Sequence, residues 1–267
     1  MATIIADTAC IDPHADIADD VEIGPYCVIG PDVTIGRGCR LIAHVCLRGH
    51  TTLGENNVVH PFAVLGGEPQ DISYKGQPTR LEIGDNNVFR EGVTIHRGSE
   101  KEVGLTKVGS NCYLMANVHV GHDCVLGDRI LVANNSMFSG HINVHSFATI
   151  SGGVGLHQFV SVGSHCYIGG LSRIVHDAPP YMLVEGNPSK VRCINVVGLK
   201  RNNLSAEAIA SLHEAHRLIF RARMTISHAT EILESHGHLC PEVRKLLDFL
   251  ENQQQGKHGR GRERGRS

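Results

Sequence analysis

The chain has 267 residues, with 25 basic and 27 acidic side chains and a formal net charge of −2. This balance excludes a general electrostatic attraction to nucleic acid or to an anionic membrane surface. Aromatic residues make up only 4% of the chain and tryptophan is absent, so a large core must be built from aliphatic side chains. No apolar run approaches the roughly 20 residues that a membrane-spanning helix needs.

An apolar residue recurs every six positions through the first two thirds of the chain. The first run is Ile5, Ile11, Ile17, Ile23, Ile29, Ile35, Leu41, Leu47, Leu53, Val59 and Leu65. Ile83, Phe89 and Ile95 follow, and the second run is Val108, Leu114, Val120, Leu126, Val132, Phe138, Val144, Ile150, Leu156, Val162 and Ile168. This period fits neither a helix nor a simple strand alternation, but it suits a chain that turns a corner every six residues. We predict a mainly β solenoid in which three hexads close each coil.

Glycines and cysteines support an inward-facing stripe. A glycine often follows the stripe residue, as at Gly36 and Gly109, which suits a corner where a side chain would crowd or φ must be unusual. The small position two before the stripe holds Cys27, Cys39, Cys112, Cys124 and Cys166. We interpret these as reduced core thiols, because the nine cysteines include no CxxC pair. With no basic-apolar leader at the start of the sequence, this predicts a cytoplasmic protein.

Two segments interrupt the period, residues 66–82 and 96–107, and we predict that each is a loop extending from a corner. Long loops in a compact repeat are typically functional. The stripe ends near Gly169, and the prolines that follow indicate an exit from the solenoid. We therefore assign residues 1–190 to the solenoid.

After the solenoid the spacing changes to that of amphipathic helices. The first apolar positions are Ile209, Leu212, Ile219 and Phe220. Ser205 suits the N-cap of this helix, and further helices are predicted at 226–235 and 241–252. Residues 191–252 thus form a predicted helical domain. Residues 253–267, with five basic residues and one acid, are predicted to be a disordered solubilising tail.

The candidate chemistry lies in the histidines of the later coils. His122 precedes Asp123, and His141 follows Asp123 by 18 residues, which stacks the two on neighbouring coils. A histidine held by a carboxylate is the usual general base for a hydroxyl. Gly140 supplies a backbone N–H near the same level that suits an oxyanion. The alternative is that these groups only hydrogen-bond across a corner.

Seven ordered segments carry a resemblance to a known family. They are 94–98 (TIHRG), 104–109 (GLTKVG), 117–124 (NVHVGHDC), 133–135 (ANN), 140–141 (GH), 157–159 (HQF) and 198–201 (GLKR). Together they resemble the hexapeptide-repeat acyltransferases that act on UDP-N-acetylglucosamine (LpxA type). The resemblance implies a left-handed parallel β-helix followed by a C-terminal α-helical domain. The periodicity does not give the hand, since ordinary parallel crossovers are right-handed.

The resemblance also implies an activity. This is transfer of a 3-hydroxyacyl chain from acyl carrier protein to the 3-hydroxyl of UDP-N-acetylglucosamine, the first step of lipid A biosynthesis, with no metal and no cofactor beyond the carrier thioester. It implies His122 as general base, Asp123 as its orienting group and Gly140 as the oxyanion donor. The implied cleft residues are His96, His119, His141, His157 and Gln158. The implied assembly is a homotrimer with each cleft between two solenoids.

Further matched positions extend the implied site. Asp71, Asn195 and Arg201 match substrate-binding residues. Gly170 matches the position that limits acyl length, and its missing side chain predicts a long acyl chain. Basic residues of the helical domain, which are Lys200, Arg201, Arg217, Arg221 and Arg223, are a candidate surface for the acidic carrier protein, or simply a solvated face.

The chain departs from the family pattern at several positions. The family's lysine after the aspartate is Ser73 here, and we expect Lys75 to take its place as a binding residue. Val197 and Asn202 replace an acid and an arginine. These changes keep a 3-amino analogue of the sugar open as the acceptor.

Three other readings are weighed against this one. The N-acyltransferase of the same pathway carries an additional N-terminal domain, whereas the repeats here begin by Ile5. A zinc hydratase on the same β-helix would use three histidines that converge between subunits and leave a fourth position open. A non-catalytic scaffold predicts that the substitution His122→Ala changes no measured property.

Overall fold

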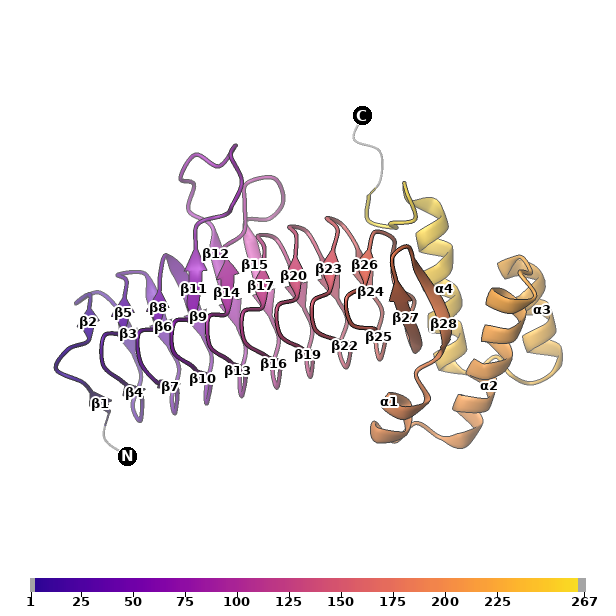
Figure 1. Ribbon diagram of the computed structural model, residues 1–267, viewed down its shortest axis with the longest axis horizontal. Helices are drawn as coiled ribbons and strands as arrows, with labels where there is room; N and C mark the ends of the chain where they lie inside the picture. The colour runs from indigo at the N-terminus through magenta and orange to yellow at the C-terminus, as the bar shows by residue number, and fades with distance from the viewer. Residues whose placement is uncertain (1–2, 264–267) are drawn as a thin grey trace.

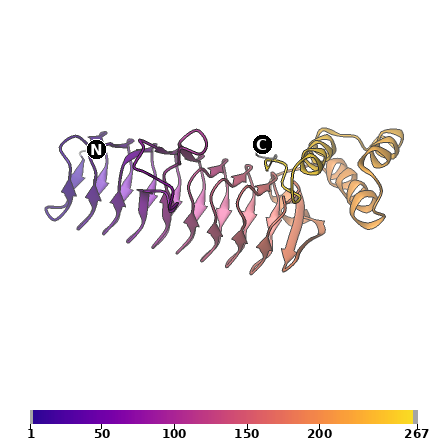
Figure 2. The same cartoon turned by 90° about the horizontal axis from the view of Figure 1, so that it is seen from above.

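The computed structural model of the protein describes residues 3–263. A long prism of short parallel strands forms the N-terminal two thirds, and a helical unit lies beyond its last coil (Figure 1). From above, the coils stack in a row along the prism (Figure 2). A mainly β solenoid followed by helices is therefore confirmed.

Three sheets form the faces of the prism within residues 3–263, and their strands pair in parallel except for a final hairpin. The first sheet contains β1 (Ile4–Ile5), β4 (Glu22–Ile23), β7 (Arg40–Leu41), β10 (Val58–Val59), β13 (Val88–Phe89), β16 (Tyr113–Leu114), β19 (Leu131–Val132), β22 (Thr149–Ile150), β25 (Tyr167–Ile168), β27 (Met182–Gly186) and β28 (Ser189–Ile194). The second contains β2 (Cys10–Ile11), β5 (Val28–Ile29), β8 (Cys46–Leu47), β11 (Val64–Gly67), β14 (Thr94–His96), β17 (His119–Val120), β20 (Met137–Phe138), β23 (Gly155–Leu156) and β26 (Arg173–Ile174). The third contains β3 (Asp16–Ile17), β6 (Val33–Ile35), β9 (His50–Leu53), β12 (Arg80–Ile83), β15 (Leu105–Val108), β18 (Val125–Leu126), β21 (Asn143–Val144) and β24 (Ser161–Val162).

The stripe residues pair with one another from coil to coil. Leu114 pairs with Val132, Val132 with Ile150 and Ile150 with Ile168, which is one coil every 18 residues. All four side chains are fully buried. The hexad period therefore sets the register of the sheets as well as the apolar core.

The glycines at the corners are required by crowding and not by φ. A Cβ on Gly36 would lie 2.6 Å from the carbonyl carbon of Gly54, and a Cβ on Gly109 would lie 2.6 Å from the carbonyl oxygen of Gly127. Neither Gly36 nor Gly109 has a positive φ. The left-handed residue comes two positions later, as at Asn111 with φ 59°. The prediction that a side chain would crowd these corners is thus confirmed at Gly36 and Gly109. The prediction that these glycines adopt an unusual φ is wrong there.

The core thiols are buried as predicted. Cys27, Cys39, Cys112, Cys124 and Cys166 are all buried, and none of the nine cysteines forms a disulfide. Burial raises the pKa of Cys112 to about 11 and that of Cys124 to about 12. These thiols therefore stay protonated and act as small apolar side chains.

Both interruptions of the period are loops, and both extend from the same edge of the prism (Figure 1). They span residues 68–79, between β11 and β12, and residues 97–104, between β14 and β15. These are shorter than the predicted ranges 66–82 and 96–107. The flanking residues belong to strands instead, since Leu81 pairs with Thr106 and Gly67 pairs with His96.

The solenoid ends in the antiparallel hairpin β27–β28, so the predicted boundary at residue 190 falls inside β28. The helices are α1 (Val196–Arg201), α2 (Ala206–His216), the π-helical turn η1 (Arg217–Arg221), α3 (Ile226–Ser235) and α4 (Pro241–Gln255). Ser205 caps α2 as predicted, because its hydroxyl accepts from the backbone N–H of Ala208 at 3.1 Å. The short helix α1 was not predicted.

The C-terminal segment differs from the predicted disordered tail. Residues 253–255 continue α4, and the backbone N–H of Gly261 then donates to the Asp177 carboxylate at 2.7 Å. Arg260 is 7% exposed and donates to the carbonyl oxygen of Val175 at 2.7 Å. The basic composition of this segment favours exposure to solvent, but the side chain of Arg260 instead donates to a backbone carbonyl group of the solenoid. Residues 264–267, also within the predicted tail, lie outside the described residues.

Among residues 3–263, no helix has the length and apolar character needed to cross a lipid bilayer.

Candidate active site

Two neighbouring corners bring the candidate catalytic residues together. His122 and Asp123 follow β17, and Gly140 and His141 follow β20 on the next coil. Asp123 and His141 both have a left-handed backbone, with φ of 59° and 65°. Residues one coil apart in this repeat occupy equivalent corners, so their side chains stack along the edge of the prism.

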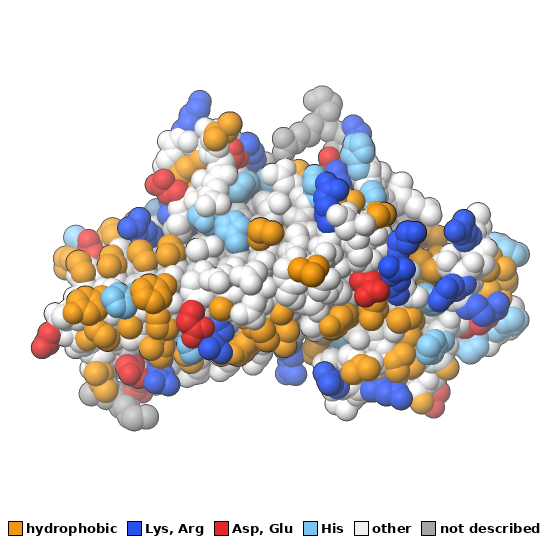
Figure 3. Space-filling model, viewed as in Figure 1, with side chains coloured by type: hydrophobic (Ala, Val, Ile, Leu, Met, Phe, Trp, Pro, Cys, Tyr) orange, Lys and Arg blue, Asp and Glu red, His pale blue; other side chains and the backbone are white. Residues whose placement is uncertain are grey.

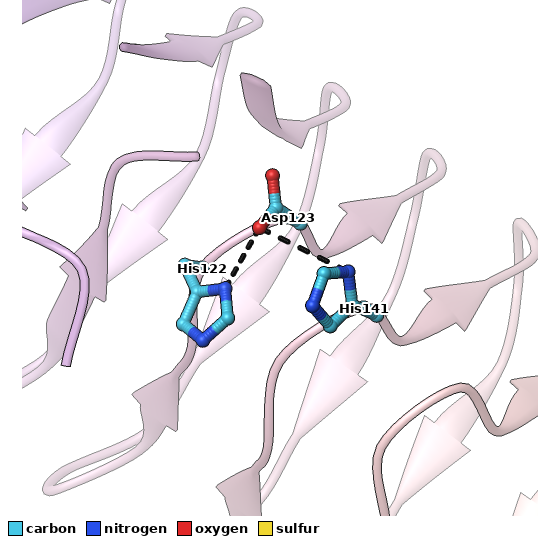
Figure 4. A group of neighbouring side chains, drawn as sticks. All are labelled: His122, Asp123 and His141. Atoms are coloured by element: carbon cyan, nitrogen blue, oxygen red, sulfur yellow. Dashed lines mark hydrogen bonds and ion pairs between the residues drawn. The ribbon is translucent and has the colours of Figure 1, made fainter. Parts of the chain in front are cut away.

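The Asp123 carboxylate is buried and fully hydrogen-bonded. Its Oδ1 accepts from the backbone N–H of Ser99 at 2.8 Å, and its Oδ2 accepts from the Ser99 hydroxyl at 2.6 Å. His122 Nδ1 lies 2.7 Å from the same Oδ2, as Figure 4 shows. Burial opposes ionisation, but the hydrogen bonds from His122 and Ser99 prevail and lower the pKa of Asp123. An ionised Asp123 places the proton of a neutral His122 on Nδ1, which leaves Nε2 able to accept another.

Gly140 leaves room for the His122 ring. A Cβ at this position would lie 2.6 Å from His122 Cε1 and 2.8 Å from Nε2. Within residues 3–263, no hydrogen bond occupies the backbone N–H of Gly140. A free N–H beside the basic nitrogen suits a developing negative charge.

His141 lies edge-on to His122, with ring centroids 5.0 Å apart, and stacks on Phe159 at 4.6 Å. Its Nδ1 is 3.1 Å from Glu102 Oε1 and 3.9 Å from Asp123 Oδ2. The contact with His141 lowers the pKa of Glu102. The second loop therefore contributes Glu102, a residue that the sequence analysis missed.

A hollow of about 270 Å³ lies over these corners, beneath the two loops. Its lining residues are Gln70, Asp71, Ile72, Lys101, His122, His141, Gln158 and Phe159. In the space-filling view, histidine side chains gather on the surface below the protruding loops (Figure 3). Of the predicted site residues, Asp71, His122, His141 and Gln158 therefore share one hollow.

Three other predicted histidines lie near this hollow without lining it. His119 Nδ1 is 2.9 Å from the Thr94 hydroxyl, and its ring meets the His96 ring edge-on at 5.2 Å. Burial, with His96 and His122 nearby, lowers the pKa of His119, so this ring is neutral at pH 7. His96 also contacts the Glu68 carbonyl oxygen. His157 is exposed, with Nδ1 3.1 Å from the Gln158 carbonyl oxygen.

The remaining predicted residues lie elsewhere in the chain. Asn195 caps α1, where its side chain accepts from the Gly198 N–H at 3.1 Å and donates to the His165 carbonyl at 2.9 Å. Arg201 is exposed at the end of α1. Gly170 follows β25, and a Cβ there would meet only ordinary contacts at 3.5 Å and beyond. Asn195 and Arg201 of a single chain do not reach His122, because α1 lies beyond the last coil (Figure 1).

The first loop places Lys75 outside this hollow. Lys75 is exposed and is not among the residues that line the hollow, whereas Lys101 of the second loop is. Lys101 Nζ lies 2.5 Å from Asp71 Oδ2. Lys101 was not among the predicted site residues, although a lysine inside a loop that was predicted to be functional is a candidate for binding.

His122, Asp123 and His141 could also be considered as metal ligands, since one candidate ligand atom from each lies within 4.8 Å of the others. Both oxygens of Asp123 already accept hydrogen bonds, however, and His122 directs Nδ1 at Oδ2. The arrangement therefore suits proton transfer by His122 Nε2 better than a three-ligand metal site.

The fold and its repeats define a hexapeptide-repeat transferase. The family described as bacterial transferase hexapeptide (six repeats) matches residues 2–37 and 105–140, and domain 2 of UDP-N-acetylglucosamine O-acyltransferase matches residues 177–259. The acyl-[acyl-carrier-protein]--UDP-N-acetylglucosamine O-acyltransferase of Syntrophobacter fumaroxidans is 42% identical over 94% of this chain and 98% of its own length. The chain belongs to the UDP-N-acetylglucosamine O-acyltransferase family.

Solved structures agree with this assignment. LpxA from Acinetobacter baumannii is 43% identical with a TM-score of 0.87, covering 92% of this chain and 95% of that one. LpxA from Bacteroides fragilis, a UDP-N-acetylglucosamine acyltransferase, is 37% identical with a TM-score of 0.89, covering 93% and 97%. The predicted left-handed β-helix is thereby confirmed.

Proposed function

We propose that the protein transfers a 3-hydroxyacyl chain from acyl carrier protein to the 3-hydroxyl of UDP-N-acetylglucosamine, the first step of lipid A biosynthesis. The observation that carries this proposal is the corner itself. His122 is held by an ionised carboxylate at 2.7 Å, and the unoccupied N–H of Gly140 lies beside its ring. The relatives' names supply the two substrates.

The corner provides each proton and charge that the reaction needs. His122 Nε2 removes the proton of the sugar hydroxyl as its oxygen attacks the thioester carbonyl carbon. The tetrahedral oxyanion accepts a hydrogen bond from the Gly140 N–H, a contact worth about 3 kcal/mol in comparable sites. The carbon–sulfur bond then breaks, and His122 returns the proton to the departing carrier thiolate. Asp123 stabilises the transient imidazolium throughout.

The complete site is formed by residues from more than one copy of the chain. Asn195 and Arg201 lie beyond the last coil, so they join a cleft at His122 only when a neighbouring solenoid presents them. We therefore propose a homotrimer with one cleft at each interface. Basic side chains of the helical unit, visible in Figure 3, are the proposed docking surface for the acidic carrier protein. Nine free cysteines favour the reducing cytoplasm.

The test is turnover by the purified wild-type protein, followed by mass spectrometry. UDP-N-acetylglucosamine and its 3-amino analogue are each incubated with carrier proteins loaded with 3-hydroxyacyl chains of different length. O-acylated product supports the proposal. Product from the amino analogue alone would show that the analogue is the acceptor. No product from either sugar nucleotide would overturn the proposed function.

The acyl-length prediction rests on Gly170. A Cβ here meets nothing closer than 3.5 Å, so the corner accepts the first atom of a side chain without a clash. We expect the substitution Gly170→Met to shift the preferred donor toward shorter chains, measured with the same donor panel. An unchanged preference would show that Gly170 does not limit acyl length.

The alternative of a zinc hydratase is not favoured by the named relatives reported above. Metal analysis of the purified protein tests it directly, because stoichiometric zinc would revive that reading. The scaffold alternative is tested by the same turnover assay.

A further inference from the structure

The Asp71 carboxylate is the acidic group that the first loop directs into the hollow. Its side chain is only 11% exposed, although it sits on a loop that projects from the prism. Ser73 donates to Asp71 Oδ1 twice, through its backbone N–H at 3.0 Å and its hydroxyl at 2.9 Å. Ser73 of the same loop thus fixes Oδ1 of this carboxylate.

The second oxygen is held from the other loop. Lys101 Nζ lies 2.5 Å from Asp71 Oδ2, and this ion pair joins residues 68–79 to residues 97–104. Lys101 is itself 38% exposed, and it lines the hollow together with Asp71, His122 and His141. The hydrogen bond from Lys101, with those from Ser73, holds the pKa of Asp71 well below its usual range.

The same second loop also supports the catalytic corner. Ser99 donates to Asp123, and Glu102 contacts His141 at 3.1 Å. Lys101 lies between these two residues in the sequence, so the loop that positions the histidines also positions the first loop. Ser73 and Lys101 occupy three of the roughly four lone-pair sites of this carboxylate, which leaves one on Oδ2 for a sugar hydroxyl. The position and charge of this acceptor are set before binding.

We propose that Lys101 is a positioning residue for the acceptor sugar, which acts by holding the Asp71 carboxylate so that Oδ2 accepts a hydrogen bond from a hydroxyl of the bound sugar. This inference rests on the proposed function, since it assigns the hollow to the acceptor. It gives Lys101, a lysine of the second loop, a role at the site.

The experiment measures KM for UDP-N-acetylglucosamine and kcat in the full-length protein. We expect Lys101→Met to raise KM by about tenfold, since a hydrogen bond to a charged group is lost or loosened, with kcat changed by less than about twofold. Lys101→Arg keeps the charge and should restore most of the affinity. Lys107→Met is the matched control, because Lys107 is exposed on β15 and lies outside the hollow.

A double-mutant cycle separates action through Asp71 from direct contact with the ligand. If Lys101 acts through Asp71, adding Lys101→Met to Asp71→Asn raises KM by less than about twofold further. Additive effects would overturn the positioning role, because Lys101 would then bind the substrate itself. Wild-type KM in Lys101→Met, or an equal change in Lys107→Met, would also overturn it while leaving the proposed function standing. Absence of any wild-type turnover would instead overturn the proposed function, and this inference with it.

Discussion

At the scale of single residues, the site depends on Asp123 keeping one arrangement of hydrogen bonds. Ser99 donates to both oxygens of the carboxylate, and His122 Nδ1 lies against Oδ2. The burial of Asp123 would favour the neutral acid, but these donors reverse that preference. The histidine tautomer is thereby set before any substrate arrives, which is the condition for general-base catalysis.

The substitution Gly140→Ala tests how closely the ring fits. An alanine Cβ cannot remain 2.6–2.8 Å from the His122 ring, so the ring must move away from the reacting hydroxyl. We expect the single-turnover rate to fall about 100-fold, a typical result of misplacing a catalytic group by an ångström. Gly155→Ala on a neighbouring coil is the control, since no atom lies within 4 Å of a Cβ there. Equal rates in the two variants would contradict this account.

The pairing of His122 with Asp123 could be predicted from the sequence, because the two residues are adjacent at one corner. The 18-residue repeat likewise predicts that His141 lies one coil away from Asp123. The pairing of Asp71 with Lys101 could not be predicted in this way. These two residues lie on separate loops without a period, and nothing in either loop's sequence indicates which side chains will meet. Glu102 was missed for the same reason.

At the scale of elements, the hexad repeat determines strands, register and core, and it fails only where the chain leaves the prism. The predicted loops are longer than the observed ones because Leu81 and Thr106 belong to strands, although neither occupies a stripe position of the hexad repeat. The segment 256–263 was misjudged because its composition suggests solvation, whereas its contacts are with backbone groups of the solenoid, such as the Val175 carbonyl. Composition does not reveal an acceptor that another coil supplies.

Docking of the C-terminal segment on Asp177 predicts a pH-dependent stability. Burial raises the pKa of Asp177 to about 6, so between about pH 4 and pH 6 the folded chain binds a proton that the unfolded chain does not. Stability contributed by this group is therefore greatest below pH 4 and is lost as the pH rises through 6, by about 3 kcal/mol. We expect the Asp177→Asn variant to lack this loss in urea titrations across pH 4.5–7.5.

The control for that titration is Asp248→Asn, an exposed acid on α4. Its stability should follow the wild-type pH dependence. If Asp177→Asn and wild type gave parallel curves, the buried carboxylate would not be the titrating group.

At the scale of the whole molecule, a single chain presents only part of the proposed site. Strand β17, which His122 follows, lies near the middle of the prism, whereas α1 lies beyond the last coil (Figure 1). Apolar side chains such as Met137 and Leu171 are 56% and 83% exposed on the solenoid. Such residues fit an interface between copies, where they would be covered.

The assembly itself gives a prediction. Light scattering coupled to size-exclusion chromatography should return three times the chain mass of 28.9 kDa. In the turnover assay, mixing inactive Arg201→Ala and His122→Ala chains should restore activity, because some mixed interfaces contain both intact residues. A monomer that retains full turnover would contradict the shared cleft.

The most direct test of the account is the single-turnover rate of acyl transfer by wild type and His122→Ala, with the product identified by mass. We expect O-acylated UDP-N-acetylglucosamine from wild type and a rate at least about 100-fold lower in the variant, since a general base contributes that much or more. Both proteins should show the same thermal unfolding midpoint within a few degrees. Wild-type rates in a folded His122→Ala protein would contradict the central claim that His122 is the base.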